Sequence, residues 1–225
     1  MTKVKICGIS KVENAQAAVD AGADFVGIVF EPNSRRCVGT EEAKKIIEST
    51  EMGNRTEMVQ WVGVFANQSV EEVNRIVEHC GIDVVQLSGK ESPEYCAQMI
   101  RPVVKVIHIG LDANQVSLTE IRHNIASYET AGCSYLLDTF KKGILGGTGQ
   151  VFNWDIAKVL SEERLLFLAG GLNTDNVSEA IFKVRPWALD VSSGVESDGQ
   201  KDSDKIHSFI KKIRQIDCNG ASSQL

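Results

Sequence analysis

Eight short apolar segments alternate with amphipathic segments along the chain, and this alternation constrains the fold more than any other feature. The apolar segments are nearly continuous and lack strict apolar–polar alternation, which is typical of strands buried on both faces. In chain order they are Val4–Cys7, Phe25–Phe30, Val59–Ala66, Val84–Leu87, Val103–Ile109, Tyr135–Asp138, Leu165–Ala169 and Leu189–Val191.

The segments between these apolar runs carry helix start signals. Ser69 is followed three residues later by Glu72, a capping-box pattern, and Ser117 with Glu120 repeats it. An amphipathic segment after such a signal predicts a helix that packs one face against the strands. Further helix starts are predicted at Thr40, Ser92, Asn153, Asn173 and Ser203.

A strand followed by a helix, eight times, indicates parallel strands joined by right-handed crossovers. Eight such units in 225 residues favour a closed (β/α)8 TIM barrel, here one domain over residues 1–216 with a polar, frayed tail over 217–225. The alternative is an open doubly wound sheet. That fold usually has a glycine-rich turn after its first strand, and Cys7-Gly8-Ile9-Ser10 does not fit a dinucleotide fingerprint.

Composition and charge exclude several functional classes. Lys and Arg number 24 and Asp and Glu 30, so the net charge of −6 disfavours nucleic-acid binding. No run reaches the roughly 18 apolar residues of a membrane span, and no targeting segment is recognisable, so we expect a cytoplasmic protein. The six cysteines show neither C-x-x-C pairs nor zinc-like spacing to histidine, so no metal is expected and most thiols should be small buried hydrophobes.

Glycine and hydroxyl residues follow the last three predicted strands. In a TIM barrel these loops meet at the mouth, where phosphate is commonly bound by backbone N–H groups. We therefore predict a phosphate site there, the alternative being ordinary tight turns. The candidate residues are Gly147, Thr148, Gly149, Gly170, Gly171, Ser192, Ser193 and Gly194.

Three further residues are candidates for chemistry at the same mouth. Cys7 ends the first predicted strand and is either a core thiol or a group facing the cavity. Asp138 ends an apolar run and either caps a loop or faces the cavity. Arg36 is either a solvated loop residue or the two-pronged partner of a carboxylate.

In this order the segments at the strand ends resemble the phosphoribosylanthranilate isomerase family of tryptophan biosynthesis, over roughly residues 3–214. The Lys-x-Cys-Gly start is particular to that family, whereas other phosphate-binding barrels share the last two motifs. The matching segments are Val4-Lys5-Ile6-Cys7-Gly8, Gly27-Ile28-Val29-Phe30, Val62-Gly63-Val64-Phe65, Val84-Val85-Gln86-Leu87, Leu137-Asp138, Gly146-Gly147-Thr148-Gly149, Leu168-Ala169-Gly170-Gly171-Leu172 and Asp190-Val191-Ser192-Ser193-Gly194-Val195-Glu196.

The resemblance implies an Amadori rearrangement of N-(5-phosphoribosyl)anthranilate to 1-(2-carboxyphenylamino)-1-deoxyribulose 5-phosphate, without metal or organic cofactor. Carried over by position, Cys7 is the general base, Asp138 the general acid and Arg36 the partner of the anthranilate carboxylate. We expect Asp138 to be partly desolvated and Cys7 to be reachable from the cavity. A small phosphorylated substrate is the expected partner, and a monomer is the expected state.

The sequence departs from the family at two loops. Arg35 stands where the family commonly has proline, and Ser88 stands where it commonly has histidine. Other phosphosugar barrels fit less well. An indole-glycerol-phosphate synthase would have Lys and Glu pairs at strand ends, a ribulose-phosphate epimerase would have a metal cluster of His and Asp, and the histidine-pathway isomerase would have aspartate in place of Cys7. A catalytically silent, ligand-binding barrel is the alternative from another class, and Cys7 with Asp138 argues against it.

Overall fold

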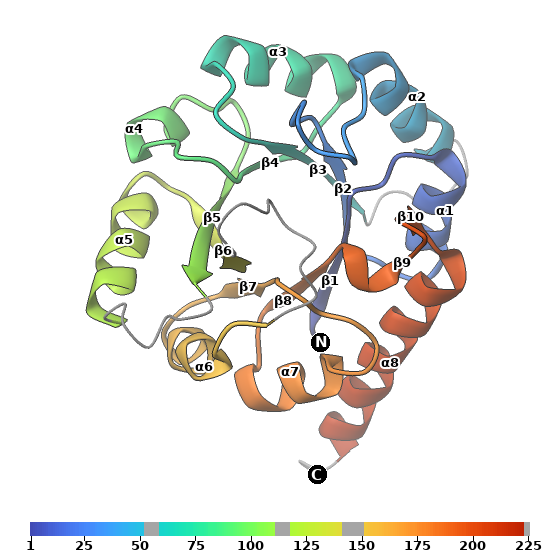
Figure 1. The fold of residues 1–225 in the computed structure, drawn as a ribbon, viewed down its shortest axis with the longest axis vertical. Coiled ribbons are helices and arrows are strands. Elements are labelled where there is room, and N and C mark those ends of the chain that lie inside the picture. The colour runs from blue at the N-terminus through green and yellow to red at the C-terminus, as the bar shows by residue number, and fades with distance from the viewer. Residues whose placement is uncertain (52–58, 111–117, 141–150, 223–225) are drawn as a thin grey trace.

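The eight predicted strands form one closed barrel of parallel strands surrounded by helices (Figure 1). The computed structural model describes residues 1–51, 59–110, 118–140 and 151–222. Each strand pairs with the next along the chain, and the last pairs with the first. They are β1 (Lys3–Cys7), β2 (Phe25–Val29), β3 (Gln60–Phe65), β4 (Val84–Leu87), β5 (Val103–Gly110), β6 (Ser134–Phe140), β7 (Leu166–Leu168) and β8 (Ala188–Val191). The TIM-barrel prediction is confirmed.

The helices between the strands begin largely where the caps predict. Ser69 accepts a hydrogen bond from the Glu72 N–H at 3.2 Å, and Asn153 accepts one from the Asp155 N–H at 2.9 Å. Ser117 lies outside the described residues. No helix of the described ranges is long and apolar enough to cross a membrane. The helices are α1 (Val12–Asp20), α2 (Thr40–Glu51), α3 (Val70–Cys80), α4 (Pro93–Cys96), α5 (Leu118–Thr130), α6 (Trp154–Glu163), α7 (Val177–Val184) and α8 (Ser203–Ser222).

Two helix boundaries differ from the sequence expectation. α7 begins at Val177 and not beside Asn173, whose side chain instead accepts the N–H groups of Asp175 and Asn176 in the turn before the helix. α8 continues past residue 216, where we expected the barrel domain to end, as far as Ser222. Within this extension the Asp217 carboxylate accepts hydrogen bonds from the N–H and hydroxyl of Thr2, at 2.8 and 2.9 Å. A tertiary contact with the start of the chain therefore supports this part of the helix.

The loop after β8 contains a short 3₁₀ helix, η3 (Ser193–Val195), and a hairpin of β9 (Glu196–Ser197) and β10 (Gln200–Lys201). Its turn consists of Asp198 and Gly199, which have φ of 52° and 76°. Positive φ at both positions is typical of a type I′ turn, for which Asp-Gly is a favoured pair. The hairpin brings Glu196 and Lys201 together, because the two residues are paired in register.

Side chains alternate between the barrel interior and the layer under the helices. Phe25, Phe167 and Trp187 pack in the interior with ring centroids 5.0–6.0 Å apart. Because successive side chains on a strand point to opposite faces, Lys5 and Cys7 share the inner face of β1. Polar side chains therefore lie inside the barrel as well, beyond these apolar rings and towards the carboxyl ends of the strands.

Candidate active site

A cavity of about 700 Å³ opens at the carboxyl ends of the strands. The lining comes from loops after most of the strands, far apart in the sequence. Candidates that line it are Cys7, Arg36, Asp138, Gly170, Gly171, Ser192 and Ser193. The barrel thus brings together most of the described residues that the sequence singles out.

Cys7 ends β1 with its thiol toward this cavity and only 8% of its surface exposed. Gly27 on β2 makes room for it, since a methyl group on Gly27 would lie 3.0 Å from Sγ of Cys7. The next residue, Gly8, turns the chain away from the strand with φ of +82°, a region that favours glycine. The expectation that the thiol is reachable from the cavity agrees with this geometry.

The charge environment of Cys7 is mixed. Burial raises the pKa of the Cys7 thiol, because a buried thiolate loses its hydration. The Lys5 ammonium opposes this rise, the Asp190 carboxylate adds to it, and Lys201 opposes it. The net shift is upward, so the thiol depends on these cations to lose its proton.

Asp138 lies on β6 at the same level as His108 of β5, with which it is in register. Burial raises the pKa of Asp138 to about 6, while His108 lowers it and Asp190 raises it further. The His108 ring Nε2 lies 3.0 Å from the carbonyl oxygen of Ser88, so that nitrogen carries the proton. A carboxyl with a raised pKa next to a cavity has the properties of a proton donor.

Arg36 reaches the cavity from the loop after β2, but its guanidinium is already bonded within the protein. Nε and Nη2 donate to the Glu196 carboxylate at 2.6 and 3.1 Å, and Arg35 donates to the same carboxylate at 2.6 Å. Lys201 adds a further hydrogen bond to Glu196 at 2.8 Å. Burial alone would raise the pKa of Glu196, but the hydrogen bonds from Arg36 and Lys201 lower it to about 2.

The loops after β7 and β8 form a cradle of backbone N–H groups. Gly170 and Gly171 have φ of +88° and +67°, which side-chain-bearing residues rarely adopt. Gly194 packs against the backbone of the β7 loop, where a methyl group would meet the carbonyl oxygen of Leu172. Within the described residues, the N–H groups of Gly171, Ser193 and Gly194 make no hydrogen bond. Unpaired N–H groups in neighbouring glycine-containing loops are suited to an anion.

Ser192 joins this cradle to a buried cation. The Lys201 ammonium donates to the Ser192 carbonyl at 2.8 Å and to its hydroxyl at 3.3 Å. Positive charge therefore lies directly behind the candidate anion site. The third predicted stretch of the site, Gly147 to Gly149 with Thr148, lies outside the described residues.

Sequence reasoning missed the polar residues inside the barrel. Lys5 is buried at 1% exposure and donates to Gln86 at 2.8 Å and to Asp190 at 2.9 Å. The available signal was a lysine within an apolar strand, two residues before Cys7 and hence on the same face. Among the described residues no group of three or more His, Cys, Asp or Glu side chains is arranged to hold a metal ion.

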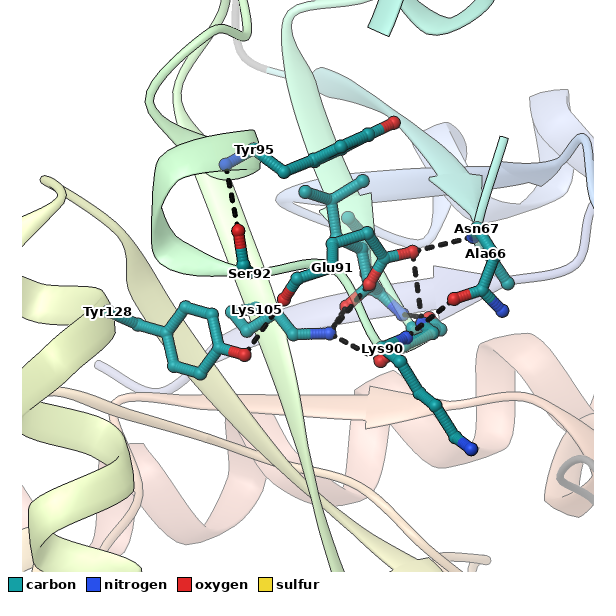
Figure 2. Close-up of polar contacts among 12 residues, drawn as sticks. Ala66, Asn67, Lys90, Glu91, Ser92, Tyr95, Lys105 and Tyr128 are labelled. Carbon is teal, nitrogen blue, oxygen red and sulfur yellow. Dashed lines mark hydrogen bonds and ion pairs between the residues drawn. The ribbon is translucent and has the colours of Figure 1, made fainter. Parts of the chain in front are cut away.

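A second buried ion pair lies beside the cavity and not in its lining (Figure 2). Lys105 and Glu91 meet at 2.7 Å with side chains 3% and 1% exposed. Glu91 also accepts the N–H groups of Asn67 and Gly89, at 2.7 and 3.2 Å. Figure 2 shows Tyr128 against this pair, with its hydroxyl donating to the Glu91 carbonyl at 2.8 Å. The pair thus ties the loop after β3 to the loop after β4.

Comparison with known proteins identifies one family over most of the chain. The model for N-(5′-phosphoribosyl)anthranilate (PRA) isomerase matches residues 4–212. The N-(5′-phosphoribosyl)anthranilate isomerase of Dehalococcoides mccartyi is 46% identical over 221 residues, which are 97% of this chain and 99% of the relative.

Several solved structures of similar fold come from the same family. The crystal structure of phosphoribosyl anthranilate isomerase from Thermotoga maritima has a TM-score of 0.83 and 36% identity, covering 96% of this chain and 100% of that one. A structure of monomers of the dimeric Thermotoga maritima protein has a TM-score of 0.79 and 35% identity, with the same coverage. A phosphoribosyl anthranilate isomerase in complex with reduced 1-(o-carboxyphenylamino)-1-deoxyribulose 5-phosphate has a TM-score of 0.78 and 35% identity, again with that coverage.

Proposed function

The chain belongs to the N-(5′-phosphoribosyl)anthranilate isomerase family, and on that premise we propose that Cys7 and Asp138 are the general base and general acid of its reaction. The enzyme converts N-(5′-phosphoribosyl)anthranilate to 1-(2-carboxyphenylamino)-1-deoxyribulose 5-phosphate in tryptophan biosynthesis. The observation that carries the proposal is that the two side chains line one cavity while burial raises the pKa of Asp138 to about 6.

Asp138 acts first in this mechanism. Its carboxyl donates a proton to the ribose ring oxygen, the bond between that oxygen and C1 breaks, and the nitrogen lone pair forms a protonated C1=N bond. A carboxyl with a pKa near 6 retains its proton far better at neutral pH than one near 4, so it is a more effective donor.

Cys7 acts second. Its thiolate takes the proton from C2, the C2–H electron pair forms a C1=C2 bond, and the electrons of the C=N bond return to nitrogen. The resulting enamine carries a hydroxyl at C2. Loss of that hydroxyl proton and protonation of C1 give the ketone, so the atoms of substrate and product balance. The base must therefore be a thiolate at the start of this step.

Binding groups fix the substrate between these two side chains. We assign the phosphate to the cradle of Gly170, Gly171, Ser192, Ser193 and Gly194, where unpaired N–H groups and the cation behind Ser192 favour an anion. The loop stretch Gly147, Thr148 and Gly149 stays part of this proposed site. Holding both ends of the substrate supplies orientation, which contributes several kcal/mol to catalysis.

We assign the anthranilate carboxylate to Arg36. Nε and Nη2 of Arg36 already bond Glu196, so the substrate carboxylate competes for the guanidinium or uses its remaining N–H groups. Glu196 then sets the orientation of the arginine before the substrate arrives.

The proposal is tested by following the decay of anthranilate fluorescence with substrate generated in situ. Cys7→Ser and Asp138→Asn should each lower kcat at least about a hundredfold while the protein stays folded. Cys218→Ser and Asp155→Asn are matched controls on the surface and should keep wild-type activity. A Cys7→Ser or Asp138→Asn enzyme within about tenfold of wild type would remove that residue from its role.

We further propose that the protein works as a monomer, the state that its acidic charge favours. The Thermotoga maritima relative is dimeric, so a dimer of this chain is the outcome that would overturn this proposal. Light scattering coupled to size exclusion gives the mass directly, and 24.6 kDa is the expected value.

A further inference from the structure

Lys5 is a deeply buried charged side chain at the site, and the mechanism above gives it no task. It lies inside the barrel at 1% exposure, beneath Cys7. A lysine in such a place is kept charged only if its surroundings compensate for lost hydration. Two acceptors do so, Gln86 Oε1 at 2.8 Å and Asp190 Oδ2 at 2.9 Å.

The end of the Lys5 side chain and the Cys7 thiol approach one point of the barrel wall. A methyl group on Gly27 would lie 3.0 Å from Sγ of Cys7 and 3.2 Å from Cε of Lys5. Both side chains share the inner face of β1, two residues apart. The absence of a side chain at Gly27 therefore leaves room for both side chains at this point of the barrel interior.

An ammonium group has three N–H donors. Among the described residues two of them are assigned, to Gln86 and Asp190. We propose that Lys5 is a positioning residue of the reaction, whose third N–H faces Sγ of Cys7 and stabilises the thiolate that takes the C2 proton. This inference rests on the proposed role of Cys7 as the base.

Charge in the neighbourhood fits this role. Burial alone would lower the pKa of Lys5, but Asp190 and Cys7 raise it, and the net direction is upward. Lys5 is also the largest influence that favours the Cys7 thiolate, ahead of the opposing influence of Asp190 and the favourable one of Lys201. The Arg36 side chain lies against Gly8, the residue that follows Cys7.

Lys5 keeps all its protons through the step. The proton moves from C2 to Sγ, and the thiolate becomes a thiol while the ammonium stays charged and paired with Asp190. Asp190 thus holds the Lys5 ammonium in place after Cys7 has taken the proton and lost its negative charge. Its other oxygen, Oδ1, is buried with no hydrogen-bond partner among the described residues, so Oδ2 provides the contact that fixes Lys5.

The test measures the thiolate directly and needs no turnover. The rate of Cys7 alkylation by iodoacetamide is followed against pH, with mass spectrometry of the Cys7 peptide separating it from the other thiols. In Lys5→Met/Asp190→Asn the midpoint should rise by about one pH unit or more, a tenfold loss of thiolate. The matched control is Glu91→Gln/Lys105→Met, which removes the other buried lysine–carboxylate pair and should leave the midpoint unchanged (Figure 2).

A second variant predicts the opposite direction. Asp190→Asn keeps the ammonium and removes the competing carboxylate, so the Cys7 midpoint should fall. In steady-state assays the Lys5→Met/Asp190→Asn enzyme should lose kcat about tenfold at neutral pH and recover part of it at higher pH, with KM within about threefold.

Two results would overturn the inference. One is an unchanged midpoint in Lys5→Met/Asp190→Asn, and the other is an equal rise in the Glu91→Gln/Lys105→Met control. If Cys7 were not the base, the activity assay would show it, because the Cys7→Ser enzyme would stay active. The alkylation midpoints would then still decide whether Lys5 stabilises the thiolate, so the two failures are distinguishable.

Discussion

The Arg36 guanidinium is clamped by the Glu196 carboxylate through two hydrogen bonds, Nε to Oε1 at 2.6 Å and Nη2 to Oε2 at 3.1 Å. The two side chains are 13% and 5% exposed, so the pair is largely shielded from water. A paired guanidinium in this position is pre-oriented, and it presents its remaining N–H groups to whatever enters the cavity.

Arg36→Met should raise KM about tenfold or more with a smaller effect on kcat, since hydrogen bonds to charged groups contribute about 1.5–3 kcal/mol. Arg35→Met is the matched control, because Arg35 bonds the same carboxylate but is 57% exposed. Its KM should stay within about threefold of wild type. An equal rise of KM in both variants, measured by steady-state fluorescence, would remove Arg36 from its assigned role.

Glu196 should stabilise the fold in a pH-dependent way. Its folded pKa of about 2 lies below the ordinary value of 4.5, so its stabilising effect is fully present above about pH 4.5 and is lost as the pH falls towards 2. Glu196→Gln should therefore cost about 2–3 kcal/mol in denaturant unfolding at pH 7. The difference from wild type should shrink steadily between pH 4.5 and 2. A pH-independent difference would contradict the assigned ion pairing.

The Asp138 carboxyl should lower the stability of the fold in a pH-dependent way, opposite to Glu196. Its folded pKa of about 6 lies above the ordinary value of 3.8, so its penalty on stability is absent below about pH 3.8 and fully present above about pH 6. Asp138→Asn should raise the free energy of unfolding by about 2–3 kcal/mol at pH 7.5. At pH 4 the gain should be under about 1 kcal/mol. Equal stability of the two proteins at both pH values would show that the carboxyl is not desolvated.

Gly170 should be needed for substrate affinity as well as for its backbone shape. In Gly170→Ala the new methyl group would lie 2.6 Å from the Thr139 backbone nitrogen, at φ of +88°. Gly22→Ala is the matched control, because Gly22 has φ of +87° and open space around it. Both should lose about 1 kcal/mol of stability from backbone strain, Gly170→Ala losing more. Only Gly170→Ala should raise KM, about tenfold. Only this variant should also weaken the stabilisation of the folded protein by inorganic phosphate.

Much of the fold was readable from the chain, because local patterns decide it. Continuous apolar runs predict buried parallel strands, and capping residues such as Ser69 and Asn153 define helix starts by bonding within their own turn. The exceptions have tertiary causes. α8 extends past residue 216 with Asp217 bonded to Thr2, a contact between the two ends of the chain.

The candidate site was predictable in part. Cys7 and Asp138 stand out as polar residues at the ends of apolar strands, and closing the barrel brings both to one cavity. The pairing of Arg36 with Glu196 was not predictable. It depends on the hairpin after β8 turning back towards the loop after β2, a contact between distant parts of the chain.

The sequence alone accounts for the number and order of strands and helices, since apolar periodicity and capping act within a few residues. It also determined the family, through short motifs in a fixed order. The meeting of Lys5, Asp190 and Gln86 beneath Cys7, by contrast, depends on how the closed barrel places its strands. Three strands supply these side chains, and no local pattern encodes which partner a buried charge finds. Low polarity inside the barrel then makes those pairings decisive, because a buried charge without its partner is strongly destabilising.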